Sequence, residues 1–409
     1  MKVALYYPWI YLTSGAERTM LRLVEHSRHE WTFITNRFQG DQTFPEFQSQ
    51  RVIELSPVSV RRTILQTTVS SLKLVTQKLP LEEFEALVIF CEGLGDLTLL
   101  RNHELPAINI CLTPLRIAFD EVYRERWGQN FPAWKRALVG MGSALFRVLD
   151  RLAWKHYSRI FCISGEVRRR VIAGGLAPAD KLDLLFPALG LDGSNTEPEY
   201  QPFFLVAGRI MWTKNLELAI SAFQEFQAAR KPGATQFRLV VAGIVDQKSK
   251  AFLAQLKQMT NGDPRIEFHI HPSDFELTEL YRTCYNTLFT AFNEDYGIVP
   301  LEGMSFGKTV VAVNRGGPRE TVSHEVNGFL EEPEPAAFAR RMTELAESPE
   351  LARSMGMAGR QHAASFTWPR FAAEVDDALE SLIQKNKSAE GRKAVPLEVN
   401  NNRQMAVGP

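Results

Sequence analysis

Two basic and two acidic residues in the second half of the chain suit a ligand that carries a diphosphate. Arg209 and Lys214 follow a short apolar run, Phe203 to Ala207. Fixed arginine and lysine side chains stabilise the negative charge that builds on a departing diphosphate without reorganising solvent. Glu294 and Glu302 flank a glycine turn with seven residues between them, so each carboxylate is able to contact a different part of one ligand.

The glycine turn between the two acids is placed to bind phosphate. Gly297 lets backbone N–H groups approach an anion closely, and the helix that follows carries partial positive charge at its N-terminus. We therefore expect the amides around Gly297, Ile298 and Val299 to form a diphosphate cradle, with Glu294 before the helix and Glu302 within it. The alternative is a helix cap with a solvated acid.

These segments resemble the signature of retaining glycosyltransferase family 4, in which two acids flank a Phe/Tyr-Gly-Ile/Leu turn and a Gly-Arg-x-x-x-x-Lys-Gly motif lies upstream. The matching segments are Gly208-Arg209-Ile210-Met211-Trp212-Thr213-Lys214-Asn215, Val240-Val241-Ala242-Gly243, Asn293 to Met304, Gly307-Lys308-Thr309-Val310-Val311 and Gly316-Gly317. Asn215 stands where the family motif ends in glycine. Ser14-Gly15-Ala16-Glu17 and Asp150 to Ser164 are similar to family segments in the first half, so most of residues 1–384 is covered.

The resemblance implies a role for each group of residues. Arg209 and Lys214 would stabilise the leaving diphosphate, Glu294 would position the transferred sugar, and these three are the expected catalytic residues. Glu302 would bind the ribose. The expected donor-binding residues are Gly15, Gly208, Gly243, Gly297, Ile298, Val299 and Glu302, and those on the acceptor side are Thr113, Arg116 and Asp120. The implied reaction is front-face substitution with retention, in which the leaving diphosphate takes the acceptor proton and no metal or other cofactor is required.

One position departs from the branch of the family that this chain most resembles. That branch carries His-Thr-Pro-x-Arg followed by an acid, and here Leu112 precedes Thr113-Pro114-Leu115-Arg116. The histidine ordinarily touches the transferred sugar, so its replacement leaves open a catalytically degenerate nucleotide-sugar-binding protein. A sugar-nucleotide epimerase of the same architecture is a further alternative.

The composition fits a two-domain globular enzyme. The chain has 409 residues, of which 45% are hydrophobic and 23% charged, enough for two ordinary cores. Its formal net charge is zero and its pI is about 7.1, so no overall field attracts nucleic acid. The four cysteines are far apart in sequence and indicate buried thiols, not a disulfide framework or a zinc site.

Short apolar runs alternate with helical patterns in both halves, which predicts two parallel sheets covered by helices. The resemblance implies an α/β GT-B fold, with two facing Rossmann-like domains and a C-terminal crossover helix. We expect an acceptor domain at 1–190, a donor domain at 200–367, the crossover helix at 368–384 and a disordered tail at 385–409.

No signal peptide or membrane-spanning run is evident in the sequence, which predicts a cytoplasmic protein. Residues 116–170 nevertheless hold twelve basic and five acidic residues among tryptophan, phenylalanine and leucine. Such helices hold proteins on anionic membranes, so peripheral contact with the inner face of a membrane is one expectation. An ordinary helix pair with a solvated basic face is the other.

The function predicted from the sequence is that of a retaining, nucleotide-sugar-dependent hexosyltransferase. GDP-mannose is the first expected donor, because the Thr-Pro-x-Arg branch often resembles mannosyltransferases, and a UDP-sugar is the next. The expected acceptor is a glycan or a lipid-linked glycan, in surface polysaccharide or O-antigen assembly. Nucleic acid is not an expected partner.

Overall fold

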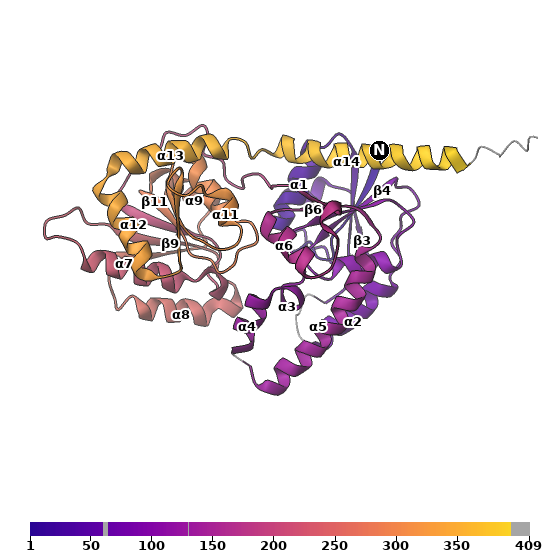
Figure 1. Cartoon of the computed structure of the whole chain (residues 1–409), viewed down its shortest axis with the longest axis horizontal. Coiled ribbons are helices and arrows are strands. Elements are labelled where there is room, and N and C mark those ends of the chain that lie inside the picture. Colours follow the sequence, from indigo (N-terminus) through magenta and orange to yellow (C-terminus); the bar gives the residue numbers. More distant parts are fainter. Residues whose placement is uncertain (60–63, 130, 394–409) are drawn as a thin grey trace, which may run out of the picture.

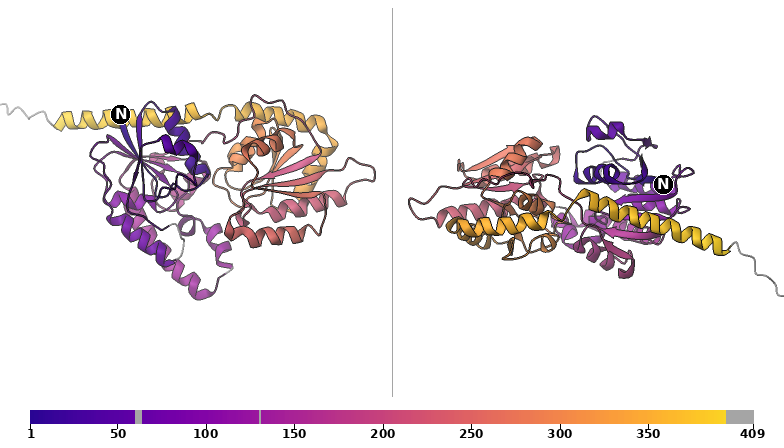
Figure 2. Two further views of the ribbon diagram at one scale, coloured as in Figure 1. Left: turned by 180° about the vertical axis from the view of Figure 1, so that it is seen from behind. Right: turned by 90° about the horizontal axis from the view of Figure 1, so that it is seen from above.

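Two open parallel sheets, each covered by helices, form the two halves of a computed structural model that describes residues 1–59, 64–129 and 131–393 (Figures 1 and 2). The sheets lie within the two ranges predicted for the domains, although the boundaries at 190 and 200 stay a prediction. A long C-terminal helix leaves the second half and runs along the first (Figure 1).

The first sheet has seven parallel strands in the order β3-β2-β1-β4-β5-β6-β7. Its strands are β1 (Lys2–Tyr6), β2 (Glu30–Thr35), β3 (Val52–Glu54), β4 (Ala86–Cys91), β5 (Ala107–Cys111), β6 (Tyr157–Cys162) and β7 (Leu182–Leu184). The helices of this half are α1 (Gly15–His26), α2 (Ile64–Thr76), α3 (Arg116–Phe119), α4 (Glu121–Gln129), α5 (Ala133–Trp154) and α6 (Gly165–Ala173), with 3₁₀ turns at Pro45–Ser49, Gly95–Leu100 and Ala179–Lys181.

Alternation along each strand sends side chains to two different cores. In β1, Val3 and Leu5 pack toward α1 and the C-terminal helix, whereas Ala4 and Tyr6 pack toward the face that α2, α5 and α6 cover. Both faces are buried, which explains why the strands read as continuous apolar runs.

The second sheet has six parallel strands in the order β10-β9-β8-β11-β12-β13. Its strands are β8 (Phe203–Ala207), β9 (Arg238–Gly243), β10 (Ile266–Ile270), β11 (Asn286–Phe289), β12 (Val310–Val313) and β13 (Gly328–Glu331). The helices are α7 (Leu216–Ala228), α8 (Lys250–Met259), α9 (Asp274–Thr283), α10 (Ile298–Ser305), α11 (Pro318–Thr321), α12 (Pro335–Glu347), α13 (Pro349–Ala363) and α14 (Trp368–Lys393), with 3₁₀ turns at Trp212–Lys214 and Gln247–Ser249.

Both sheets reverse their strand order beside the first strand of the half, between β1 and β4 and between β8 and β11. In open α/β sheets, ligands bind outside the carboxyl ends of the strands at such a point. The loops after β8 and β11 carry Lys214 and Glu294, so the fold brings the two predicted motifs to one place.

The structure differs from the sequence prediction in the edge strands and the last helix. The short edge strands β3, β7 and β13 were not predicted, because β3 and β7 have only three residues and β13 has only two apolar side chains. Helix α14 continues to Lys393, beyond the predicted end at 384 and into the predicted disordered tail. Lysine, glutamate and alanine there are good helix formers, which favours the extension of the helix. Residues 394–409 lie outside the described part of the chain.

The four cysteines are free and buried, as predicted. Their spacing in the sequence concealed that three of them are neighbours in space. Cys91, Cys111 and Cys162 pair in register across β4, β5 and β6, and all three belong to the same core cluster. Among the described helices, none combines the length and the apolar character that crossing a bilayer requires.

Candidate donor site

The first site segment is the loop between β8 and α7. Gly208 has φ 135°, a value that glycine adopts readily, and its N–H donates to the carbonyl of Ala242 at 3.0 Å. Asn215 replaces the motif glycine and also takes the left-handed conformation, with φ 49°. Asparagine tolerates that conformation better than other side chains, so the substitution preserves the turn that presents Lys214.

Lys214 and Glu294 form an ion pair between the loops that follow β8 and β11. The backbone fixes both partners: the N–H of Phe292 donates to the carbonyl of Thr213 at 2.8 Å, and the hydroxyl of Thr290 donates to the carbonyl of Lys214 at 2.8 Å. The sequence predicted each residue but not that they would meet.

Burial raises the pKa of Glu294, but the charge of Lys214 and its hydrogen bond, with the charges of Arg116 and Arg209, outweigh that effect and leave the pKa below its ordinary value. Glu294 is therefore ionised at neutral pH and holds the Lys214 ammonium in place. Arg209 is exposed at the start of the same loop. An anchored lysine and an exposed arginine thus act on one fixed carboxylate.

Helix α10 begins at the glycine turn, as the sequence predicted. Gly297 precedes it with φ 88° and provides no side-chain cap. The amides of Ile298 and Val299 in the first turn have no intrahelical acceptor, so they are available to a ligand. A Cβ on Gly317 would lie 2.0 Å from the carbonyl oxygen of Tyr296, so only glycine lets the two loops pack this closely.

Glu302 lies inside α10 and is 9% exposed. It accepts hydrogen bonds from the Tyr281 hydroxyl at 3.1 Å and from the Leu191 N–H at 3.2 Å. Burial raises the pKa of Glu302 to about 6, while the Tyr281 hydrogen bond and the charge of Arg18 act in the opposite direction. Arg18 comes from α1 and donates to the carbonyl of Gly190 at 2.7 Å, so a residue of the first half helps to set this environment.

The three predicted acceptor-side residues lie at the junction of the two halves. Arg116 binds Asp120 at 2.8 Å and donates to the carbonyl of Asn293 at 3.1 Å, and the Thr113 hydroxyl donates to Asp295 at 3.3 Å. Asp120 also accepts from the Tyr123 N–H at 3.0 Å at the start of α4. In this conformation these side chains position the segment that carries Glu294.

Two ion contacts between the halves had no signal in the sequence. Arg170 of α6 forms an ion pair with Asp295, and the carboxylate of Glu320 accepts from the N–H groups of Gly165 and Glu166 at 2.5 and 2.9 Å. The first turn of α6 therefore receives an acid from the other half, in agreement with the positive end of its dipole. More than 100 residues separate the partners, and no local pattern predicts such pairs.

Gly15, a predicted donor-binding residue, and Leu112, which replaces the histidine of the resembling branch, both lie on the first half. Gly15 begins α1 after the N-cap Ser14, and a Cβ there would meet nothing within 4 Å, so it faces open space. Leu112 directly follows β5 and packs, partly buried, against the core of the first half. It is an apolar contact where the resembling branch has a histidine. Within residues 1–59, 64–129 and 131–393, no group of three or more His, Cys, Asp or Glu side chains is arranged to hold a metal ion.

Comparisons with known proteins give a family match and several relatives. Residues 191–362 match the family described as glycosyl transferases group 1. The human alpha-1,3/1,6-mannosyltransferase ALG2 is 32% identical over 195 residues, which cover 44% of this chain and 47% of that protein. The mouse protein of the same name is 31% identical over 221 residues, covering 49% and 53%. The chain thus spans about half the length of these curated relatives.

Solved structures show the same architecture over nearly the whole chain. Sucrose-phosphate synthase from Thermosynechococcus elongatus superposes with a TM-score of 0.72 at 16% identity, covering 94% of this chain and all of that one. Anabaena Alr3699/HepE, in complex with UDP and glucose, gives a TM-score of 0.68 at 17% identity, covering 93% and 100%. The chain therefore has the GT-B fold of two facing Rossmann-like domains, and its residues 191–362 match the family described as glycosyl transferases group 1.

Proposed function

We propose that the protein transfers a sugar from a nucleoside diphosphate donor to a glycan or lipid-linked acceptor, with retention of the anomeric configuration. The observation that carries this proposal is the Lys214–Glu294 pair, which stands beside Arg209 and the open first turn of α10. GDP-mannose is the first candidate donor, because the human and mouse relatives are named mannosyltransferases, and a UDP-sugar is the second. The comparisons give no support to the epimerase alternative.

In the proposed reaction the acceptor hydroxyl attacks the anomeric carbon on the face that the diphosphate leaves. Arg209 and Lys214 stabilise the charge that develops on the leaving oxygens, and the amides of Ile298 and Val299 bind a phosphate. The departing phosphate oxygen takes the acceptor proton, so the step needs no separate base. Glu294 holds the transferred sugar, and Glu302 accepts hydrogen bonds from the ribose.

The site's acids favour catalysis by protein cations over catalysis by a bound metal. Glu294 is paired with Lys214, Asp295 with Arg170, and Asp120 with Arg116. Carboxylates that are already neutralised in this way are poor ligands for a divalent ion. We expect the transfer rate to be unchanged when EDTA is added, and a rate restored only by added Mg²⁺ or Mn²⁺ would contradict this part of the proposal.

Isothermal titration of GDP, UDP and their sugar conjugates tests the donor assignment. An Arg209→Ala, Lys214→Ala double variant should lose the nucleotide that the wild type binds, since both diphosphate cations are gone. Lys231→Ala is the matched control, because Lys231 is exposed beyond the far end of α7. Unchanged binding in the double variant would overturn the assignment.

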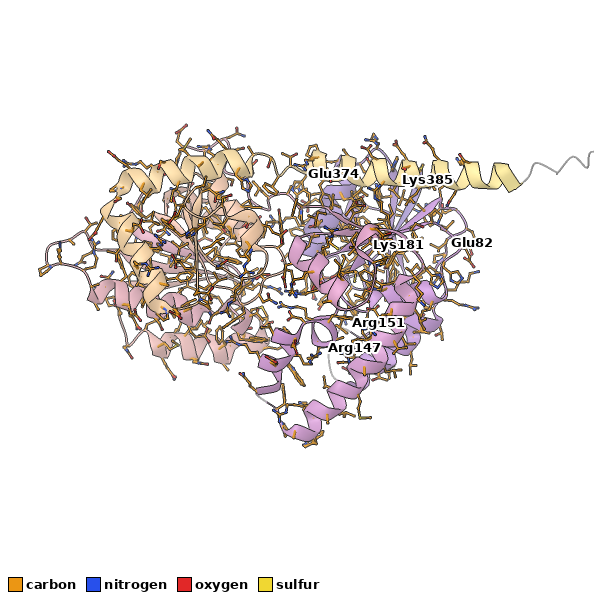
Figure 3. The ribbon with its side chains drawn as sticks, viewed as in Figure 1. Glu82, Arg147, Arg151, Lys181, Glu374 and Lys385 are labelled. Carbon is orange, nitrogen blue, oxygen red and sulfur yellow. The ribbon has the colours of Figure 1, made fainter. Side chains whose placement is uncertain are left out.

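The outer face of α5 supports a further part of the proposal, contact with a membrane. Large apolar side chains spaced three or four residues apart stand exposed along this helix; they are Trp134, Leu138, Met141, Leu145, Val148 and Leu152, between 43% and 70% exposed. In the described part of residues 126–165 the only acid is Asp150, which is buried. Arg147 and Arg151 lie along the same helix (Figure 3), and Lys135 and Arg136 near its start.

We infer that α5 lies on an anionic membrane surface, such as the leaflet that faces the cytoplasm. Rows of exposed apolar side chains enter the membrane interface. Each flanking basic residue strengthens binding to an anionic surface by about 1 kcal/mol. A Leu138→Ser, Leu145→Ser variant should sediment less with vesicles containing phosphatidylserine. Ile172→Ser, which changes an exposed apolar residue on α6, should not. Vesicle binding that is independent of anionic lipid would contradict this inference.

A further inference from the structure

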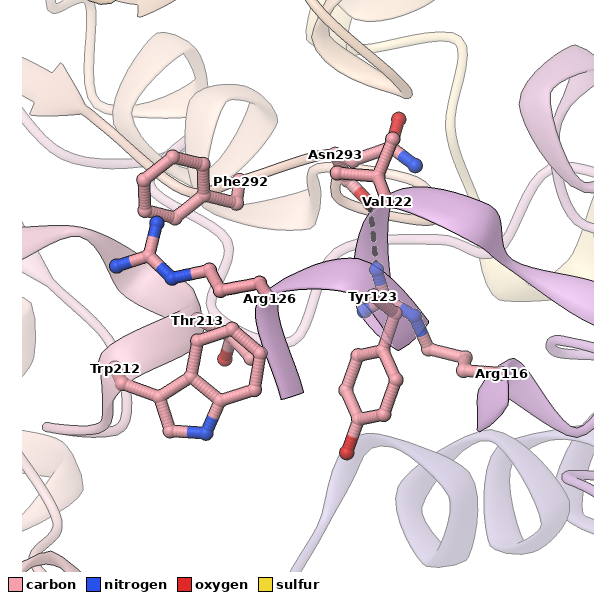
Figure 4. Close-up of a pocket in the computed structure, with 8 residues that line it drawn as sticks. All are labelled: Arg116, Val122, Tyr123, Arg126, Trp212, Thr213, Phe292 and Asn293. Carbon is pink, nitrogen blue, oxygen red and sulfur yellow. Dashed lines mark hydrogen bonds between the residues drawn. The ribbon is translucent and has the colours of Figure 1, made fainter. Parts of the chain in front are cut away.

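The guanidinium of Arg126 is held between two aromatic rings where the halves meet (Figure 4). Its Cζ lies 3.5 Å from the ring centre of Phe292 and 5.2 Å from that of Trp212. Arg126 belongs to α4 of the first half, whereas both rings belong to the loops of the second half. Tyr123, one turn earlier on α4, places its ring 5.5 Å from Trp212, and these residues line a small pocket.

Within the described part of the chain, Arg126 forms no ion pair, in contrast to its basic neighbours. Arg116 is paired with Asp120, and Arg170 with Asp295. The Arg126 guanidinium contacts the two rings and, among the described residues, forms no hydrogen bond or ion pair. Burial lowers its pKa, which the charge of Glu217 opposes without forming an ion pair. A guanidinium whose faces are covered by rings keeps its N–H groups at the edge, where they form a planar fork.

The pocket adjoins the proposed reaction centre, because its lining includes Thr213 and Asn293, which directly precede Lys214 and Glu294. Trp212 is two residues before Lys214, and Phe292 is two residues before Glu294. The bond from the Phe292 N–H to the Thr213 carbonyl, at 2.8 Å, locks these two segments together. On the other side, α4 is followed in the chain by α5, which carries a row of exposed apolar side chains.

We propose that Arg126 binds an anionic phosphate group of the acceptor, at a subsite whose walls are Trp212, Phe292 and Tyr123. The inference rests on the proposed function and names the acceptor class: a sugar joined through phosphate to an alkyl chain. The phosphate accepts hydrogen bonds from the fork of Arg126, and the chain extends along α4 toward the apolar face of α5. The acceptor sugar then lies next to Lys214 and Glu294.

Octyl phosphate is a probe for this subsite, with octyl glucoside as the neutral comparison. Tryptophan fluorescence of the full-length protein is titrated with each compound below its micelle concentration, with and without saturating GDP or UDP. We expect octyl phosphate to bind the wild type in both conditions. Arg126→Ala should weaken binding about 10- to 100-fold, the range for hydrogen bonds to a charged group, and Arg126→Lys should recover part of it.

Two further variants control the experiment. Arg124→Ala removes a neighbouring base on α4 and should bind as the wild type does, whereas Trp212→Phe should lose most of the fluorescence change. Equal binding by Arg126→Ala and the wild type would overturn the proposal, as would absence of binding to the wild type. Displacement of octyl phosphate by the nucleotide would assign Arg126 to the donor, and equal binding of octyl glucoside would show an apolar site only.

The nucleotide titration distinguishes this inference from the proposed function. If octyl phosphate binds through Arg126 but no nucleotide binds anywhere, the donor assignment fails and the phosphate subsite stands. If nucleotides bind at Lys214 and Arg126→Ala has no effect, the subsite fails and the transferase proposal stands. Unchanged nucleotide affinity in Arg126→Ala also shows that the variant is folded.

Discussion

Glu302 illustrates how burial prepares a carboxyl group for a ligand. Its pKa of about 6 means that the folded protein favours its proton, so this group adds stability below its unfolded pKa and that contribution is lost as the pH rises through 6. Only the ionised form is a pure hydrogen-bond acceptor. At neutral pH the Glu302 carboxylate is therefore buried and ionised, and ribose hydroxyls would donate hydrogen bonds to it.

We predict that nucleotide affinity weakens as the pH falls below about 6, because protonated Glu302 accepts the ribose hydrogen bonds less well. The check is calorimetric titration of the nucleotide between about pH 5 and pH 8. Glu302→Gln provides the control, since glutamine does not titrate while the phosphates of the nucleotide titrate equally in both proteins. Identical pH profiles for the two proteins would contradict the prediction.

Glu294→Gln tests the other acid of the pair. The amide keeps the shape but loses the charge that anchors Lys214, so the transferred sugar and the ammonium are held less well. We expect the turnover number to fall about 100-fold, as for a small misplacement of reacting groups, with a smaller change in nucleotide affinity. Steady-state kinetics with the donor identified by calorimetry measure both. A loss of nucleotide affinity as large as the loss of turnover would assign Glu294 to the diphosphate instead.

At the scale of elements, the end of β9 requires glycine at position 243, because the β8–α7 loop packs directly against its backbone. A Cβ on Gly243 would lie 1.7 Å from the carbonyl oxygen of Gly208, so alanine there forces the β8–α7 loop to move. We predict that Gly243→Ala lowers the melting temperature and abolishes nucleotide binding. Gly140→Ala is the control: a Cβ there meets nothing within 4 Å, and alanine should add about 0.5–1 kcal/mol within α5. Equal melting temperatures for the two variants would refute this account.

Helix α14 is fastened to the first half by a buried acid. Asp376 is fully buried and accepts hydrogen bonds from the Ser27 hydroxyl at 2.6 Å and the Arg28 N–H at 2.8 Å. Asp376→Ala leaves both donors unsatisfied and should cost about 1–3 kcal/mol of unfolding free energy. Asp377→Ala removes a neighbouring exposed partner of Arg28 and should cost less than about 1 kcal/mol. Urea denaturation measures both, and equal losses would show that burial does not decide the effect.

At the scale of the whole molecule, the carboxylate of Glu320 accepts hydrogen bonds from two N–H groups in the first turn of α6. These bonds help to set how the halves meet. We predict that Glu320→Ala speeds hydrogen exchange at the amides of Gly165 and Glu166 and increases the radius of gyration in solution scattering. Glu332→Ala, which removes an exposed ion pair with Arg315 within the second half, should leave both unchanged. Unaltered exchange in Glu320→Ala would show that other contacts hold the halves together.

The α/β rhythm, the strands that begin each half and the turn at Gly297 followed from the sequence, because period, glycine geometry and short motifs are local properties. The tertiary structure alone decided that Lys214 meets Glu294, that Arg170 and Glu320 join the halves, and that three cysteines stand in one row. It also decided that Arg126 lies against two rings and, among the described residues, forms no ion pair. These contacts join residues far apart along the chain, and packing, not local propensity, determines which distant side chains become neighbours.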